Sequence, residues 1–335
     1  MGPLLFIFYI TAIIESWKKS TKTKPCIFRS SKFFNKPTGR SFKTQGDKNE
    51  FRDSAYADDT AVVFTNRQDT EIGVNELISH FQKFGMEIHT ESINKNSKSE
   101  ILYVPALPHA SNNSNSNPPH FPQNPVVCPN NTFIPIVDAF KYLGSFLNST
   151  LSDHKDVLAR IEAASKAFGS LKKTIFKNIF IHRDVKVAVY RSLIIPILLY
   201  GSECWFLTSP NKSALVTFHN SCARQILNLT KKRQRENYIS SQTILNTLKL
   251  PYIETLLFKH QLRYYGHICR MNYNRLPRKL INSWLSKRRP HGSPRITQGR
   301  YMKYVLEEAN ISIQNWHKIA NDRIQWKSLI NKLHT

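Results

Sequence analysis

The chain has 335 residues, enough for two or three domains, and its 41% hydrophobic content argues against a chain that is disordered throughout. Lys and Arg number 48 against 23 acidic residues, so the net charge is +25 and the sequence predicts a polyanionic partner. The five cysteines are odd in number, scattered and never in a CxxC pair, which argues against a disulfide framework or a zinc knuckle and favours a reducing compartment.

The first predicted element is an apolar helix over 4–17, with Pro3 at its first turn. Its apolar run, Leu4–Ile14, is only eleven residues long and follows no basic residue, so a buried core helix is favoured over a membrane span or a secretory signal. We therefore expect a nuclear or cytoplasmic protein with no membrane partner. A fully apolar helix at the first residues also suggests that the sequence starts inside a larger domain.

A basic loop and a hairpin are predicted next. Residues 18–48 hold ten basic side chains and Asp47 as the single acid, with little periodicity, which is typical of a solvated loop. Residues 54–64, SAYADDTAVVF, place two short runs of strand-forming residues around Asp58 and Asp59, which predicts a tight hairpin with acids at its turn.

The following segment alternates helix, strand and insertion. Helical spacing of apolar residues predicts a helix over 69–84, and 101–104 is predicted as a short strand. Residues 105–129 are rich in Asn, Ser and Pro and are predicted to form a disordered insertion. Residues 133–147 then predict a strand and a tight turn at Gly144.

From residue 154 onward the pattern is helical. An apolar stripe at three- and four-residue steps predicts an amphipathic helix over 154–175, followed by a helix over 185–200 bent at Pro196 and a third over 215–226. Lys231–Arg235 is interpreted as a basic turn rather than a nuclear-import signal. A further helix is predicted to open with Pro251 at its first position and to run to about Met271.

The acid pair within Tyr56-Ala57-Asp58-Asp59 has two interpretations. Two carboxylates in a turn commonly close a hairpin through local hydrogen bonds. Two carboxylates on a rigid hairpin tip also suit a divalent metal in phosphoryl transfer, because Mg²⁺ takes one or two carboxylates in addition to substrate phosphates. The residues alone leave both interpretations open.

Several motifs in order carry a family resemblance. They are GPLLF at 2–6, AYADDTAVVF at 55–64, FQKFGMEI at 81–88, KSEIL at 98–102, FKYLGS at 140–145, LLYGSECW at 198–205, RYYGHICRM at 263–271 and ANDRIQW at 320–326. Together they resemble the second half of the palm, the thumb and the post-thumb region of a non-LTR (LINE-type) retrotransposon reverse transcriptase. The resemblance covers nearly the whole chain except 18–48 and 105–129.

The resemblance implies roles for individual residues. Asp58 would be a ligand of catalytic Mg²⁺ and Asp59 a neighbouring carboxylate of that site. Tyr56 would lie beside the primer end, and Lys98 near the incoming triphosphate. The primer grip would comprise Phe140, Tyr142, Leu143 and Gly144.

The sequence also departs from the family. The family's two-metal site needs a further aspartate from an earlier strand, and the template-binding fingers lie there too; neither is present in this sequence. We therefore expect a nucleotidyltransferase relative that is N-terminally truncated and inactive alone. The alternatives are a non-catalytic RNA- or DNA-binding protein derived from a retroelement, and an unstable fragment.

The C-terminal region predicts nucleic-acid contacts. Its aromatic residues Tyr264, Tyr265, Tyr273, Trp284 and Tyr301 interleave with basic ones, which suits stacking of unpaired bases beside phosphate contacts. The candidate phosphate-binding residues are Arg263, Arg270, Arg275, Arg278, Lys287, Arg288 and Arg289. The alternative is a solvated helix face whose aromatic residues are core. His267 and Cys269 are interpreted as packing and surface residues rather than half of a metal site.

The expected fold class is α+β. A partial palm, an antiparallel hairpin with packed helices, would occupy 1–150 with its two insertions. An all-α thumb would follow at 151–230 and a basic helical region at 231–335. The expected partners are RNA and DNA, and the sequence defines no protein partner.

Overall fold

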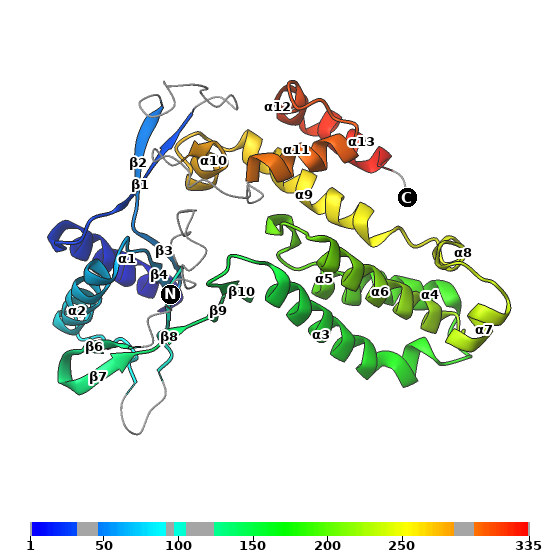
Figure 1. Cartoon of the computed structure of the whole chain (residues 1–335), viewed down its shortest axis with the longest axis horizontal. Coiled ribbons are helices and arrows are strands. Elements are labelled where there is room, and N and C mark those ends of the chain that lie inside the picture. Colours follow the sequence, from blue (N-terminus) through cyan, green and yellow to red (C-terminus); the bar gives the residue numbers. More distant parts are fainter. Residues whose placement is uncertain (1, 32–45, 92–96, 105–123, 285–297, 334–335) are drawn as a thin grey trace, which may run out of the picture. The chain divides into compact units, whose positions relative to one another are not determined.

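The computed structural model describes residues 2–31, 46–91, 97–104, 124–284 and 298–333 (Figure 1). The chain divides into two compact units: unit 1 is 1–151 with 282–294, and unit 2 is 152–281 with 295–335. The division after residue 151 lies next to the predicted boundary at 150. Residues 152–281, however, share a unit with 295–335, because helices from both sides of residue 231 pack on one another.

Unit 1 mixes helices with short strands. Its elements are α1 (Gly2–Ser20), β1 (Cys26–Ser30), β2 (Asp47–Phe51), β3 (Asp53–Tyr56), β4 (Asp59–Val62), α2 (Arg67–Lys83), β5 (Ile101–Leu102), β6 (Val126–Cys128), β7 (Thr132–Ile134), β8 (Ile136–Val137), β9 (Ala139–Tyr142), β10 (Ser145–Asn148) and β11 (Ser283–Trp284). Strands β11, β1 and β2 form an antiparallel sheet in that order. The pairs β3–β4, β6–β7 and β9–β10 are antiparallel, and β5–β8 is parallel.

Helix α1 is only half buried, so the prediction of a core helix over 4–17 is wrong for its first turns. Residues 4–9 are all exposed, whereas Ile13 and Trp17 are almost completely buried. In the described part of unit 1, α1 contributes Ile10, Ile13 and Ile14 to a core cluster that also contains Phe81 of α2. The residues before Ile10 lie outside this cluster. The second half of α1 therefore does the packing.

The basic segment 18–48 is not one loop. Helix α1 continues to Ser20, and β1 forms at Cys26–Ser30 between β2 and β11. Phe28 and Ser30 of β1 are buried, and the side chain of Asn49 donates to Ser30 Oγ at 2.9 Å. Strand β1 pairs with β2 over five residues and with β11, about 250 residues away in the sequence, over two, and this pairing rather than the basic composition of the segment decides its structure. Residues 32–45 lie outside the described residues.

The predicted insertion, 105–129, wrongly includes strand β6. Val126 and Cys128 of β6 are buried against α2, so the last residues of that segment belong to the core. Residues 105–123 lie outside the described residues.

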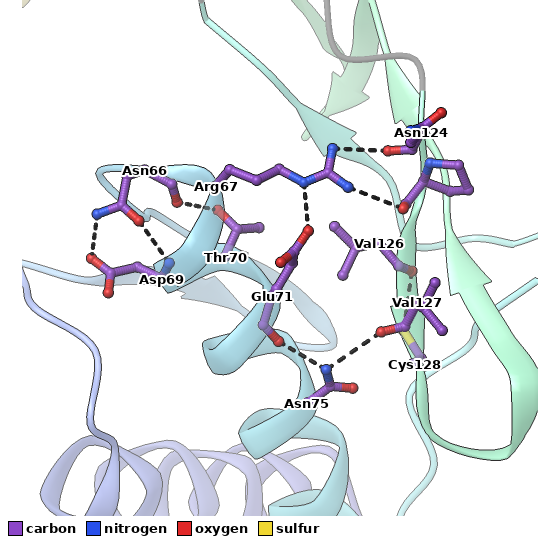
Figure 2. A network of polar contacts seen from close by, with 11 residues as sticks. Asn66, Arg67, Asp69, Thr70, Glu71, Asn75, Asn124, Val126, Val127 and Cys128 are labelled. Atoms are coloured by element: carbon purple, nitrogen blue, oxygen red, sulfur yellow. Dashed lines mark hydrogen bonds and ion pairs between the residues drawn. The ribbon is translucent and has the colours of Figure 1, made fainter.

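Polar contacts fix β6 to the first turns of α2 (Figure 2). Arg67 Nε pairs with Glu71 Oε1 at 2.6 Å, and its other guanidinium nitrogens donate to the carbonyls of Asn124 at 2.9 Å and of Pro125 at 3.2 Å. Asn75 Nδ2 donates to the Val127 carbonyl at 3.4 Å. Arg67 of α2 thus binds the two residues that directly precede β6.

Unit 2 is almost entirely helical within the described residues. Its helices are α3 (His154–Leu171), α4 (Arg183–Val189), α5 (Ile195–Leu198), α6 (Ser209–Ile226), α7 (Lys231–Glu236), α8 (Ser241–Thr247), α9 (Ile253–Arg270), α10 (Leu276–Ile281), α11 (Gln298–Glu308), α12 (Trp316–Asn321) and α13 (Arg323–Lys332). Helix α9 starts two residues after Pro251, with Tyr252 as its N-cap, so the proline precedes the helix rather than opening it.

The apolar stripe predicted for 154–175 lies in α3 and contributes to the core of unit 2. Val157, Ala164 and Phe168 of α3 are buried together with Leu215 of α6, as the spacing predicted. The ring of Phe168 stacks on Phe176 with centroids 4.2 Å apart and meets the edge of Tyr190. The α-helix predicted over 185–200 is interrupted just before Pro196 by a π-helical turn, Tyr190–Ile194, consistent with a proline that lacks the amide proton needed to continue an α-helix.

Several buried polar groups in this core are hydrogen-bonded. The Tyr190 hydroxyl lies 2.9 Å from His219 Nδ1, and His219 Nε2 donates to the Pro251 carbonyl at 3.1 Å. Burial lowers the pKa of His219 to about 4, so the imidazole is neutral, and Nδ1 must accept from the hydroxyl. Trp205 Nε1 donates to Asp156 at 2.8 Å, and burial raises the pKa of neighbouring Asp153 to about 6.

The motifs RYYGHICRM, at 263–271, and ANDRIQW, at 320–326, pack against each other. Gly266 of α9 faces Trp326 of α13 so closely that an added Cβ would lie 2.1 Å from Trp326 Nε1. That indole nitrogen donates to the Leu262 carbonyl at 2.9 Å. Cys269 is buried, with its sulfur 3.4 Å from the His317 carbonyl, whereas His267 is exposed. The interpretation of His267 and Cys269 as surface and packing residues is confirmed.

Candidate functional site

The acidic motif lies on a hairpin, as predicted. Strands β3 and β4 pair with Tyr56 opposite Asp59, which leaves a two-residue turn of Ala57 and Asp58. Ala57 adopts a left-handed backbone with φ of +54°, which is uncommon for a residue with a Cβ and reverses the chain tightly. Tyr56, Asp58 and Asp59 are all exposed, so the hairpin presents its carboxylates to solvent.

Ion pairs and hydrogen bonds hold the base of this hairpin. Asp53 pairs with Lys18 of α1 at 2.8 Å, and Arg52 donates to the Thr23 carbonyl at 2.9 Å. Burial lowers the pKa of Lys18, but hydrogen bonds to Asp53 and Glu15 outweigh it and raise the pKa overall. The hairpin is thus tied to the end of α1 by charged contacts.

The predicted primer-grip residues form a second hairpin. Leu143 and Gly144 make the two-residue turn between β9 and β10, with φ of +47° and +86°, as a type I′ turn requires. The Tyr142 hydroxyl donates to the Ser54 carbonyl at 3.1 Å, and the rings of Phe140 and Tyr142 meet edge to face. The structure therefore joins the hairpin carrying FKYLGS to the strand carrying the acidic motif.

Lys98 is not brought into contact with the acidic hairpin. Its side chain is exposed, and its backbone amide donates to His89 Nδ1 at 3.1 Å. Between the described residues Lys98 and Asp58 or Asp59 there is no hydrogen bond or ion pair. Its role near a triphosphate remains a prediction from the resemblance.

The donor set at the hairpin does not fit a two-metal centre. Mg²⁺ prefers several oxygen ligands, and a two-metal site needs carboxylates that bridge both ions. Within the described residues no group of three or more His, Cys, Asp or Glu side chains is placed to hold a metal ion. The two adjacent carboxylates Asp58 and Asp59 alone are too few ligands for that chemistry.

The predicted phosphate-binding residues of the C-terminal region divide into three groups. Arg263 and Arg275 are exposed, as a phosphate contact requires. Arg270 donates to the Ala320 carbonyl, and Arg278 is partly buried, which lowers the pKa of its guanidinium. The remaining candidates, Lys287, Arg288 and Arg289, lie outside the described residues.

The predicted stacking aromatics are mostly core, which corrects the prediction of a basic stacking surface there. Tyr265, Trp284 and Tyr301 are buried, and the Tyr301 hydroxyl accepts a hydrogen bond from Gln261 Nε2 at 3.2 Å. Tyr273 is half-buried beside Lys279. Adjacent residues on a helix point about 100° apart, so an Arg–Tyr–Tyr run places one ring inward whenever the arginine faces solvent.

The segment Lys231–Arg235 is a helix rather than the predicted turn. It forms most of α7, and its four basic side chains are all exposed. The sequence signal was available: the segment contains no Gly or Pro, and Thr230 precedes it as an N-cap whose hydroxyl accepts from Arg233 N at 3.2 Å. This helix is the densest exposed basic cluster in the described part of unit 2.

Comparison with known proteins gives one informative similarity. The chain is 26% identical over 200 residues to an uncharacterised transposon-derived protein of Caenorhabditis elegans, a match that covers 58% of this chain and 71% of the relative. This supports a transposon origin. No family model matches the chain, and no solved structure matches it. Among the described residues, no helix combines the length and the hydropathy needed to cross a membrane.

Proposed function

We propose that the chain derives from the reverse transcriptase of a non-LTR retrotransposon and acts as an RNA- and DNA-binding protein. The observation that carries the proposal is the net charge of +25, much of it on exposed side chains of unit 2. The transposon-derived relative and the ordered motifs of the reverse-transcriptase type support the origin. Binding of this kind depends on phosphates and is independent of base sequence.

A second candidate function is RNA-directed DNA polymerase activity. The observation that favours it is the acidic hairpin held beside the FKYLGS hairpin by the Tyr142–Ser54 hydrogen bond. The observation against it is the donor set, because Asp58 and Asp59 gather no third ligand among the described residues. Loss of metal-site geometry removes the charge stabilisation on which phosphoryl transfer depends.

One assay separates the two functions. The full chain is mixed with a primed RNA template at low salt, and the complex is followed on a native gel; Mg²⁺ and deoxynucleotides are then added and the primer length is measured. We expect a shifted complex with no extended primer, and the same shift with DNA of unrelated sequence. Absence of any shift would refute nucleic-acid binding.

The matched control is Asp58→Asn, a substitution at an exposed turn position that leaves the fold unchanged. Primer extension by the unmodified chain that this variant abolishes would show that the hairpin is a working catalytic site. That outcome would contradict the proposal of a non-catalytic binding protein.

A further inference from the structure

Helix α7 and the residues after it form a basic surface in unit 2. The helix is capped at its start by Thr230. At its end Tyr238 N donates to the Arg235 carbonyl at 3.1 Å and Ile239 N to the Gln234 carbonyl at 3.0 Å. The side chain of Gln234 also donates to the Ile239 carbonyl at 3.1 Å. These bonds fix the backbone of Tyr238, which has a left-handed φ of +50°.

Tyr238 is presented to solvent by this backbone. Its side chain is 94% exposed, so nearly the whole ring is available for contact. Burial of an aromatic ring contributes favourable free energy to folding. Tyr190 and Tyr265 of unit 2 are buried, whereas the exposed ring of Tyr238 makes no such contribution. An exposed aromatic ring on a hydrogen-bonded backbone offers a face on which an unpaired base can stack.

Positive charge surrounds the ring. Arg224, Lys231 and Arg235 line a shallow, open depression together with Tyr238, and the other lining residues are Gln234, Ile239 and Ser240. Lys232 and Arg233 are exposed on the same helix. The one acid of the helix, Glu236, lies 3.8 Å from Lys232, so it offsets only part of this charge. Phosphate groups are the ligands that such a cluster attracts.

We propose that this surface binds single-stranded nucleic acid, with backbone phosphates held by Arg224, Lys231 and Arg235 and an unpaired base stacked on Tyr238. The inference rests on the proposed function and assigns it a site. A single strand is favoured over a duplex because bases in a duplex are already stacked on each other and offer no free face to the ring.

The test measures binding of the full chain to a fluorescent octanucleotide of single-stranded RNA. Tyr238→Ala should lower the affinity about 5- to 150-fold, the effect of losing one base–aromatic stack. Tyr238→Phe keeps the ring and should bind like the unmodified chain. The matched control is Phe180→Ala, since Phe180 is 92% exposed on the connection between α3 and α4 and lies outside the proposed site. It should change the affinity less than about twofold.

Two further measurements sharpen the result. Replacement of both Lys231 and Arg235 by alanine should reduce the slope of log K against log salt by about 1 to 2, because two phosphate contacts are lost. A 4-thiouridine octanucleotide should crosslink to the peptide that contains Tyr238. With a blunt duplex as the ligand, Tyr238→Ala should bind like the unmodified chain.

The outcomes distinguish this site from the proposed function. Octanucleotide binding that is unaffected by Tyr238→Ala, with crosslinks elsewhere, would overturn the site and leave nucleic-acid binding standing. Displacement of the octanucleotide by an acidic peptide of equal charge would also overturn it, because α7 would then be a protein-binding surface. Failure of the full chain to bind any oligonucleotide would refute both.

Discussion

Replacing Phe168 by alanine should lower the free energy of unfolding by about 3 to 5 kcal/mol, the cost of deleting a large buried aromatic side chain. Phe168 is 4% exposed at the centre of unit 2. It loses a stacked contact with Phe176 and an edge contact with Tyr190 when truncated. Other buried side chains hold α3 against α6, so the space left behind cannot close completely.

Equilibrium denaturation followed by circular dichroism measures this effect. The control is Lys166→Ala on the opposite face of α3, an exposed residue whose ion pair with Glu162 spans one helical turn. Its loss should change the free energy of unfolding by less than about 0.5 kcal/mol. Equal losses for the two variants would mean that the buried face of α3 is assigned wrongly.

Replacing Gly266 by alanine should cost about 3 kcal/mol, because the new Cβ has no room. It would lie 2.4 Å from Cδ1 of Trp326 as well as against the indole nitrogen, and Trp326 is 2% exposed. The indole cannot rotate away without giving up its hydrogen bond to Leu262, so α13 must shift from α9.

The matched control is Gly169→Ala in α3, where an added Cβ meets no atom within 4 Å. Alanine there should raise the free energy of unfolding by about 0.5 to 1 kcal/mol, because glycine weakens a helix interior. The same glycine-to-alanine change should thus have opposite signs at two helical positions. Thermal unfolding of both variants tests this, and a loss of stability of similar size in both would contradict the close approach of Trp326.

Local sequence patterns correctly predicted the elements whose structure depends on residues close together in the sequence. The hairpin at Asp58 and Asp59, the type I′ turn at Gly144 and the buried stripe of α3 each follow from spacing and turn chemistry within about twenty residues. Gly266 is a costly residue inside a helix, but its partner Trp326 lies sixty residues away in the sequence, and no local pattern identifies Trp326 as that partner.

The predictions that failed depend on distant partners. Strand β1 forms by pairing with β2 and with the distant β11, which the basic composition of residues 18–48 did not indicate. Tyr265 and Tyr301 looked like stacking residues because they alternate with arginines, yet packing of α9 and α11 buries both. The exposed first turns of α1 could not be foreseen, since a fully apolar segment predicts burial wherever it occurs. The palm architecture itself remains a prediction from the resemblance.

The salt dependence of nucleic-acid affinity tests the central claim most directly. If the positive charge of the chain binds phosphates, each contact releases condensed counterions, and affinity falls linearly on a log–log plot. For on the order of six phosphate contacts, the dissociation constant of the full chain for RNA or DNA should rise about a thousandfold between 50 and 200 mM salt. Affinity that is flat over this range, or absent at its lower end, would contradict the account.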